Sequence, residues 1–340
     1  MNHENNLKYF IALGKYLQHL SSIETDELFY KAANENPWFT KENVELALKG
    51  IIQLLNENDL TKWFNSYQLP QKKEKKIGVV MAGNIPAVGF HDLMCVLLSG
   101  NILLAKPSSQ DSVLIKEIIK ILIEIGPELK EKIFFVERLN DVDAIIATGS
   151  DNTSRYFEYY FKEKPHILRR NRTSVAILNG EETKEDIEEF GKDIFQYFGL
   201  GCRNVSKIYI PEGYILDRFF EGIFKFEQVK NHHKYANNYD YNRSIYLMNQ
   251  EKFLENGFVS LIESKNLVSP MAVIYYEFYK SVSDLQVELI ENQYKIQCVV
   301  SNKAWFPQSI AFGNAQCPSV NDYADGIDTM EFLKNLESKL

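Results

Sequence analysis

From Lys76 onward, short apolar segments alternate with helical segments, and this alternation constrains the fold more than any other feature of the sequence. The strand candidates of the first half are residues 77–81, 101–105, 133–136 and 144–147. Strands that alternate with helices predict a mostly parallel sheet covered by helices on both faces. We therefore expect an α/β fold.

A second alternation begins near residue 174 and predicts a second α/β unit. Its strand candidates are residues 174–178, 205–210, 244–248, 271–276 and 296–300. A helix is expected at 183–198 and a capped terminal helix at 330–336. Residues 230–241 are rich in Asn, His and Tyr and are expected to form a loop.

The first 70 residues have a different pattern, in which apolar residues recur at helical spacing. Leu7, Phe10 and Leu17 are examples of this spacing, and Ser21 or Ser22 and Thr40 are candidate N-caps or turn residues. The predicted organisation is a helical region at 1–75 packed on an α/β domain at 76–173, a second α/β domain at 174–310 and a C-terminal segment at 311–340.

Bulk properties narrow the function classes. The chain has 340 residues, enough for two domains, and a net charge of −8, which speaks against nucleic-acid binding. The sequence shows neither a signal-peptide pattern nor an apolar run of membrane-spanning length, so we expect a cytoplasmic protein. The densest basic cluster, Lys72 to Lys76, is explained by a solvated linker before a strand.

Four cysteines, at positions 95, 202, 298 and 317, lack the spacing of a zinc site or a disulfide framework, so no metal is expected. Cys202 lies between Gly201 and a strand candidate, with Gly199 nearby, where a substrate could approach the backbone. A thiol there can serve as a covalent nucleophile. In this window alone, a small buried apolar side chain is the commoner role for a free cysteine.

Four motifs occur in the order seen in aldehyde dehydrogenases, which the chain resembles over roughly residues 75 to 335. They are Gly78–Gly100, the Lys106-Pro107 loop, Ala147-Thr-Gly-Ser150 and the Cys202 segment. Two segments are similar more specifically to the LuxC-type acyl-CoA reductases. They are Gly83-Asn-Ile-Pro-Ala-Val-Gly-Phe-His-Asp92 and Asp322-Tyr-Ala-Asp-Gly-Ile-Asp328.

The resemblance implies an aldehyde-dehydrogenase-like fold, with a Rossmann-type cofactor domain and a smaller α/β catalytic domain that carries the nucleophilic cysteine. It assigns Cys202 as the nucleophile. The side-chain amide of Asn84 and the backbone N–H of Cys202 would form the oxyanion hole. Taken alone, Asn84 is more simply explained as a turn residue that tolerates a left-handed backbone.

The resemblance also implies a nicotinamide cofactor. Lys106 matches a lysine near the cofactor ribose and phosphates, and Gly149 and Ser150 match the start of a helix near the pyrophosphate. Ser109 stands where many NAD-preferring relatives have a glutamate that bonds the ribose 2′-hydroxyl. Because a serine accepts a 2′-phosphate that a carboxylate would repel, we expect NADPH.

Two further positions bear on the reaction. Leu168 aligns with the glutamate that activates water in hydrolytic aldehyde dehydrogenases, and leucine cannot act as a base. The neighbouring basic cluster of Arg169, Arg170 and Arg172 has two interpretations: contact with CoA phosphates or a solvated strand edge.

The implied function is NADPH-dependent reduction of a fatty acyl thioester, on CoA or a carrier protein, to the aldehyde through an acyl-cysteine intermediate. Two alternatives stay open. One is an acyltransferase or thioesterase that forms acyl-Cys202 without reduction, and the other is a non-catalytic acyl-binding subunit. The resemblance also leaves open an acyl-transferring protein partner and a homo-oligomer.

Overall fold

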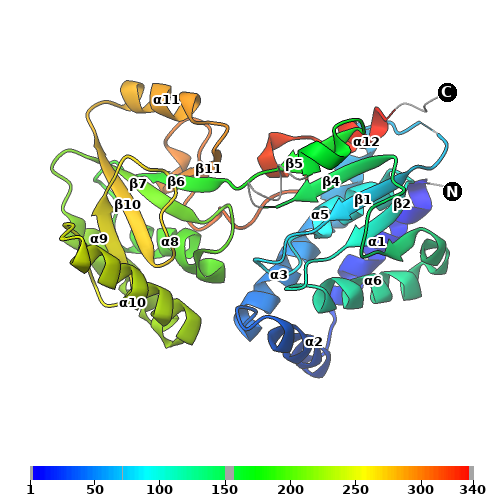
Figure 1. The fold of residues 1–340 in the computed structure, drawn as a ribbon, viewed down its shortest axis with the longest axis horizontal. Coiled ribbons are helices and arrows are strands. Elements are labelled where there is room, and N and C mark those ends of the chain that lie inside the picture. Colours follow the sequence, from blue (N-terminus) through cyan, green and yellow to red (C-terminus); the bar gives the residue numbers. More distant parts are fainter. Residues whose placement is uncertain (1–2, 71, 150–156, 337–340) are drawn as a thin grey trace. The chain divides into compact units, whose positions relative to one another are not determined.

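The computed structural model describes residues 3–70, 72–149 and 157–336. Contacts divide the chain into two compact units, which are described separately (Figure 1). Unit 1 comprises Met1–Asn171 and Pro318–Leu340, and unit 2 comprises Arg172–Cys317. The segment 311–340 is therefore split, because its residues from Pro318 onward pack with unit 1.

Unit 1 is built around a five-stranded parallel sheet with the order β3-β2-β1-β4-β5. The strands are β1 (Lys76–Val80), β2 (Ile102–Lys106), β3 (Ile133–Phe135), β4 (Ala144–Thr148) and β5 (His166–Arg169). Val79 of the central strand lies opposite Ala105 of β2 and Ile146 of β4. All three residues are buried, as expected for strands covered on both faces. The predicted parallel sheet is confirmed.

Helices of unit 1 cover this sheet. They are α1 (His3–Gln18), α2 (Ser22–Glu35), α3 (Lys41–Leu54), α4 (Glu57–Ser66), α5 (Phe90–Leu98) and α6 (Val113–Ile125). Both predicted N-caps are confirmed: Ser21 forms a capping box with Glu24, and the Thr40 side chain accepts a hydrogen bond from the backbone N–H of Asn43. The Phe10 ring in α1 packs edge-on with Phe90 in α5, with 6.2 Å between centroids, which joins the first helices to the core.

The C-terminal segment returns to unit 1 and ends in α12 (Thr329–Lys334). The Tyr323 hydroxyl accepts a hydrogen bond from the indole N–H of Trp63 at 2.9 Å and lies 2.6 Å from the Tyr67 hydroxyl. The Tyr67 hydroxyl also donates to Asp328 at 2.7 Å, and Asp328 caps α12. Burial raises the pKa of Tyr67 to about 12. The terminal helix is confirmed, and residues 322–328 have a structural role in attaching it.

A buried ion pair joins three elements of unit 1. The Arg169 guanidinium, at the end of β5, contacts the Asp92 carboxylate of α5 at 2.7 Å and donates to the Thr329 hydroxyl at 2.8 Å. Arg169 is only 5% exposed, so the expectation of a solvated strand edge is wrong for this residue. Its guanidinium is committed to Asp92. The neighbouring Arg170 is exposed and pairs with Glu158 instead.

Replacing Arg169 by Met should strongly destabilise unit 1, because it leaves the buried Asp92 carboxylate without its counter-charge. We expect a loss of about 3–5 kcal/mol in the free energy of unfolding. The matched variant Arg170→Met, which breaks only an exposed pair, should cost less than about 1 kcal/mol. Urea titration followed by tryptophan fluorescence measures both, since Trp38 and Trp63 lie in unit 1. Equal losses in the two variants would contradict this assignment.

Unit 2 contains a seven-stranded sheet with the order β12-β11-β6-β7-β10-β9-β8, in which only β8 pairs antiparallel with its neighbour (Figure 1). Its strands are β6 (Thr173–Ile177), β7 (Val205–Pro211), β8 (Leu254–Glu255), β9 (Ser260–Glu263), β10 (Val273–Tyr279), β11 (Ile296–Ser301) and β12 (Ile310–Ala311). Its α-helices are α8 (Lys184–Phe195), α9 (Leu216–Ile223), α10 (His233–Met248) and α11 (Val282–Glu291).

Two local predictions in unit 2 are wrong. The expected loop at 230–241 and the expected strand at 244–248 fall largely in the single helix α10. Its buried face is made of Tyr235, Tyr239, Asn242 and Tyr246, which recur at helical spacing. Their polar ends are bonded; the Tyr235 hydroxyl, for example, donates to the carbonyl of Phe258 at 3.1 Å. Polar aromatic residues can therefore replace the aliphatic stripe that sequence patterns detect.

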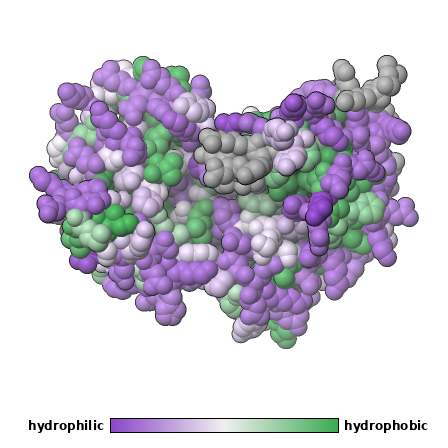
Figure 2. Space-filling model, viewed as in Figure 1, coloured by the Kyte–Doolittle hydropathy of each residue, from purple (hydrophilic) through white to green (hydrophobic). Residues whose placement is uncertain are grey.

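On the face drawn in Figure 2, hydrophilic residues predominate, and hydrophobic residues appear as small separate patches. In the described parts of the chain, no helix is both long enough and apolar enough to cross a bilayer.

Candidate active site

One edge of the unit 1 sheet collects most of the predicted site residues. Asn84 lies in the turn that follows β1, Lys106 ends β2, Ser109 lies in the next loop, and Gly149 follows β4. Because β1, β2 and β4 are adjacent and parallel, their carboxyl ends share one edge, where open α/β sheets bind ligands. Two predicted residues remain: Cys202 lies in unit 2, and Ser150 lies outside the described residues.

The turn that carries Asn84 is held by its neighbours. The Asn36 side chain donates to the carbonyl of Gly83 at 3.3 Å. A Cβ on Gly83 would come within 2.6 Å of the Ser108 hydroxyl, so only glycine fits where this turn meets the loop after β2. Ala87 has a left-handed backbone with φ of 55°, and its N–H donates to Asp111. The half-buried Asn84 therefore sits in a turn fixed at both ends.

Asp111 is the support that the sequence did not reveal. Its side chain is 1% exposed, and one carboxyl oxygen accepts the backbone N–H of Ala87 at 2.7 Å. The other oxygen is buried and has no hydrogen-bond partner among the described residues. Burial raises the pKa of Asp111 to about 8, against the opposing hydrogen bond from Ala87. A neutral carboxyl group thus adjoins the predicted cofactor loop at neutral pH.

Replacing Asp111 by Asn should change how stability depends on pH. The folded-state pKa lies above the unfolded value, so wild type loses stability as pH rises from about 4 to 8. Asn keeps the acceptor for Ala87 and does not titrate. The stability of the variant relative to wild type should therefore increase over this window, by up to about 1.4 kcal/mol per pH unit. Urea titrations at several pH values test this; a constant difference between the proteins would show that Asp111 titrates normally.

The donor set at this edge fits the phosphate groups of a nucleotide. Lys106 supplies a positive charge, and Ser109 is exposed in the same loop. The nearest carboxyl group in sequence, Asp111, is buried and turned toward Ala87. Glu35 accepts from the backbone N–H groups of Ser112 and Val113 and thereby caps α6. Neither acid is positioned in this loop as a ribose-binding glutamate would be.

Cys202 lies in unit 2, in an exposed turn just before β7. The preceding residues Tyr197, Phe198 and Gly199 all have left-handed backbones, with φ of 53°, 56° and 78°. For residues other than glycine this conformation is strained, and such strain is concentrated at functional sites. The Cys202 turn is therefore a conformation that the surrounding structure must enforce.

Hydrogen bonds from the side chains of Asn204 and Ser174 hold this turn in place. The Asn204 side chain accepts the N–H of Gly201 at 2.8 Å and donates to the carbonyl of Gln196 at 2.9 Å. The Ser174 hydroxyl, in β6, donates to the carbonyl of Cys202 at 3.0 Å. These bonds fasten the turn both to the end of α8 and to the sheet.

Asp193 at the end of α8 supports the same region. Its carboxyl oxygens accept the backbone N–H groups of Gly313 at 2.7 Å and Ala315 at 3.0 Å. Burial raises the pKa of Asp193 to about 7, against these two hydrogen bonds. The Arg203 side chain, next to the nucleophile candidate, donates to the carbonyl of Ala315 at 3.3 Å. Residues 313–315 are thus part of the scaffold around Cys202.

The other three cysteines have less favourable surroundings for a nucleophile. Cys95 is fully buried, and burial raises its pKa well above the ordinary thiol value. Burial likewise raises the pKa of Cys298 to about 11, and its sulfur lies 3.0 Å from the Ser174 hydroxyl. Cys317 is exposed, but partial burial of its sulfur and the charge of Asp193 raise its pKa. Cys202, by contrast, is exposed and lies in a turn that hydrogen bonds from Asn204 and Ser174 hold in place.

The comparison with protein families decides the membership of the chain. A family model described as acyl-CoA reductase (LuxC) matches residues 16–221, more than half of the chain. The chain belongs to the LuxC acyl-CoA reductase family. The resemblance that the motifs predict is thus confirmed. The match spans Asn84, Lys106, Ser109, Gly149 and Cys202.

Solved structures show the fold of this LuxC family member. An Escherichia coli NADP-dependent enzyme is 14% identical, with a TM-score of 0.65 over 88% of this chain and 73% of its own. The Pseudomonas syringae indole-3-acetaldehyde dehydrogenase AldA is 12% identical, with a TM-score of 0.65 over 93% and 75%. The Pseudomonas aeruginosa aldehyde dehydrogenase KauB is 13% identical, with a TM-score of 0.64 over 88% and 72%. The aldehyde-dehydrogenase-like fold is confirmed. A search of curated proteins gives no match.

Sequence reasoning missed the residues that support the site. Asn36, Asp111, Ser174 and Asp193 act through hydrogen bonds to backbone groups remote from them in sequence, whereas Asn204 bonds the nearby Gln196 and Gly201. Only Asn204, two residues after the candidate nucleophile, lies in a segment that the sequence singled out. Asn84 and Cys202 belong to different units, so their pairing across one substrate stays a proposal.

Proposed function

We propose that this protein reduces a fatty acyl thioester to the aldehyde with NADPH, through an acyl-Cys202 intermediate. One observation carries the proposal: Cys202 is exposed and lies in a turn held by hydrogen bonds, in a chain that belongs to the acyl-CoA reductase family. The coarser part of this statement, an oxidoreductase of acyl groups, follows from the family. The nucleophile, the cofactor choice and the chain class of the acyl group are our inferences.

The proposed chemistry uses the chain's own groups in two stages. The Cys202 thiolate attacks the thioester carbonyl carbon, a C–S bond forms to Cys202, and the CoA thiolate leaves. Asn84 and the backbone N–H of Cys202 would donate to the oxyanion that develops on the carbonyl oxygen. Once the acyl carbon has received hydride, the resulting thiohemiacetal oxyanion on Cys202 re-forms the carbonyl and its C–S bond breaks. These events release the aldehyde and restore the thiolate.

NADPH would be held at the carboxyl edge of the unit 1 sheet, by Lys106 and Ser109 at the 2′-phosphate and ribose and by Gly149 beside the pyrophosphate. When bound it supplies the hydride that reduces the acyl carbon. Structures of similar fold include a protein described as NADP-dependent and others in complex with NAD+. The choice of NADPH rests on Ser109 and on the inward-facing, largely neutral Asp111.

Leu168 favours reduction over hydrolysis. It lies on β5 and packs against the apolar cluster of Leu139, Val142 and Ile145. A side chain committed to that cluster cannot activate water. An acyl-Cys202 intermediate formed without such a base would persist until it is reduced or returned to CoA.

Replacing Cys202 by Ala should abolish covalent acylation, because alanine provides no sulfur to accept the acyl group. Incubation with radiolabelled acyl-CoA should label wild type and leave Cys202→Ala unlabelled. NADPH oxidation should fall by at least about a thousandfold. The matched control is Cys317→Ala, which removes another exposed thiol of unit 2 and should keep activity within about threefold. Equal labelling of all three proteins would rule out Cys202 as the nucleophile.

The same assay separates reduction from the alternatives. Acyl-CoA consumption without NADPH oxidation, across a series of chain lengths, would indicate an acyltransferase or thioesterase. Binding without turnover would indicate a non-catalytic subunit.

Replacing Ser109 by Glu should reduce the preference for NADPH over NADH, because a carboxylate repels the 2′-phosphate and can bond a ribose hydroxyl. We expect the ratio of kcat/KM values for NADPH and NADH to fall by about 10- to 100-fold, which corresponds to about 1.4–2.8 kcal/mol. Ser109→Gln is the control of similar size without charge and should change the ratio far less. An unchanged ratio in Ser109→Glu would place the 2′-position elsewhere.

A further inference from the structure

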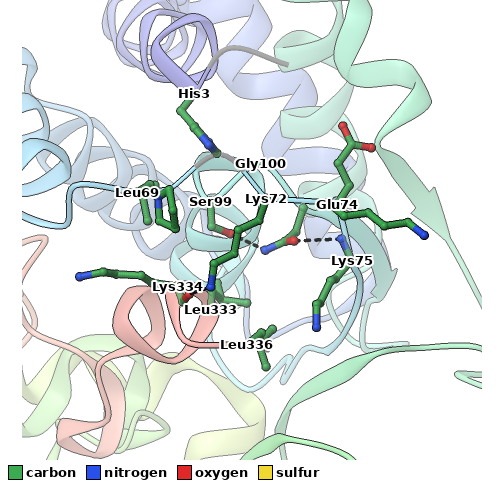
Figure 3. Close-up of a pocket in the computed structure, with 13 residues that line it drawn as sticks. His3, Leu69, Lys72, Glu74, Lys75, Ser99, Gly100, Leu333, Lys334 and Leu336 are labelled. Carbon is green, nitrogen blue, oxygen red and sulfur yellow. Dashed lines mark hydrogen bonds between the residues drawn. The ribbon is translucent and has the colours of Figure 1, made fainter. Parts of the chain in front are cut away.

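A second site candidate lies at the opposite edge of the unit 1 sheet. Figure 3 shows a pocket lined by residues from α1, from the end of α12 and from the segments before β1 and β2. Residues 72–75 directly precede β1, and residues 99–101 directly precede β2. In a parallel sheet the amino ends of the strands lie opposite the carboxyl ends. This amino-edge pocket is therefore separate from the edge that carries Asn84 and Lys106.

The lining of the amino-edge pocket is strongly basic. Four of its residues are lysines: Lys72, Lys73, Lys75 and Lys334. Its one acidic lining residue, Glu74, forms an ion pair with Lys132, outside the lining. Lys334 also has the Glu331 carboxylate at 3.5 Å. This concentration of positive charge occurs in a chain whose net charge is −8, so it marks a local preference for anions.

The pocket walls are built and cross-linked. Lys72 donates to the carbonyl of Lys334 at 2.8 Å, which ties the segment before β1 to the end of α12. Asn101 accepts the backbone N–H of Lys75 at 3.1 Å and donates to the Ser99 hydroxyl at 2.9 Å. Figure 3 marks these bonds as dashed lines. The hollow is therefore a feature of the folded unit.

His3 contributes an uncommitted polar atom. Its Nδ1 is buried and has no hydrogen-bond partner in the described part of the chain. The ring packs against Gly100, where a Cβ would come within 2.6 Å and where φ is +78°, so a glycine is required there. A buried polar atom without a partner costs free energy unless something bonds it. An anion in the pocket would give an Nδ1–H group that partner.

The volume of the pocket limits the size of the ligand group. It is about 70 Å³, whereas one water needs only about 10–15 Å³. The space suits a tetrahedral oxyanion in place of several waters. The positive field of the lining lysines favours a doubly charged anion over a singly charged carboxylate, and lysine is a common phosphate ligand.

We propose that the amino-edge pocket binds a phosphate group, either free phosphate or the phosphate of a small monoester, independently of the cofactor edge. Lys72, Lys73, Lys75 and Lys334 supply the positive field, and His3 donates through Nδ1. This site is distinct from the proposed reduction and does not depend on it.

Calorimetric titration of the full chain at low ionic strength tests the proposal with inorganic phosphate, glycerol 3-phosphate and acetate. Phosphate should bind and acetate should bind at least about tenfold more weakly. Tighter binding of glycerol 3-phosphate would identify a monoester as the ligand, and its exclusion would identify free phosphate. No binding of either phosphate compound, or equal binding of acetate, would overturn the proposal.

Two lysine variants and the NMR signals of His3 show where on the protein phosphate binds. Lys73→Glu should weaken phosphate binding by about tenfold or more, whereas Lys130→Glu, an equal charge change on another exposed lysine of unit 1, should change it less than about twofold. Phosphate should shift the ring resonances of His3, assigned among six histidines with His3→Gln. Equal weakening in both lysine variants or an unmoved His3 signal would each overturn the proposed site.

Discussion

The parallel pairing of β1 with β2 and β4 is the constraint on which the arrangement of unit 1 depends. Because the three strands run in the same direction, every loop that follows a strand reaches one edge of the sheet, and every loop that precedes one reaches the other. Asn84, Lys106 and Gly149 are thereby gathered at one edge by topology alone. The same constraint sends the lysines before β1 to the amino-edge pocket, so the two proposed sites lie at opposite edges of the sheet.

The C-terminal segment stabilises the helix that follows the Asn84 turn. Asp92, in the first turn of α5, is bound to Arg169 and, through it, to Thr329 of α12. A buried ion pair of this kind adds little net stability relative to apolar packing, but removing one partner is costly. Its effect is therefore to select one arrangement of α5, β5 and α12. The Asn84 turn is then fixed by Asn36, Asp111 and the anchored helix together.

The sequence predicts the parts of this molecule whose pattern is local. Short β-branched segments between turns give the strands of unit 1, and Ser21 and Thr40 identify helix starts because capping needs only a few neighbouring residues. Helix α10 escapes prediction because tyrosines and Asn242 form its buried face and find partners distant in sequence.

The burial of charged residues cannot be predicted from the sequence for a related reason. In the sequence, Arg169 and Asp111 resemble surface residues. The fold buries both, and it supplies Asp92 as the partner of Arg169 and the Ala87 N–H as the donor to Asp111. The candidate nucleophile, by contrast, is visible in the sequence, since its glycine-flanked segment is contiguous. What surrounds it is not contiguous, because Ser174 and Ala315 reach it from other elements.

In the turn before Cys202, hydrogen bonds from neighbouring elements offset the free-energy cost of a strained backbone. Two non-glycine residues in left-handed conformations cost on the order of 1–3 kcal/mol each. The hydrogen bonds of Asn204 and Ser174 to backbone groups of this segment contribute about 1 kcal/mol each. The strained conformation therefore persists because several elements specify it. A main chain fixed in advance needs no rearrangement when charge develops on a bound carbonyl, which is the condition under which backbone donors stabilise an oxyanion best.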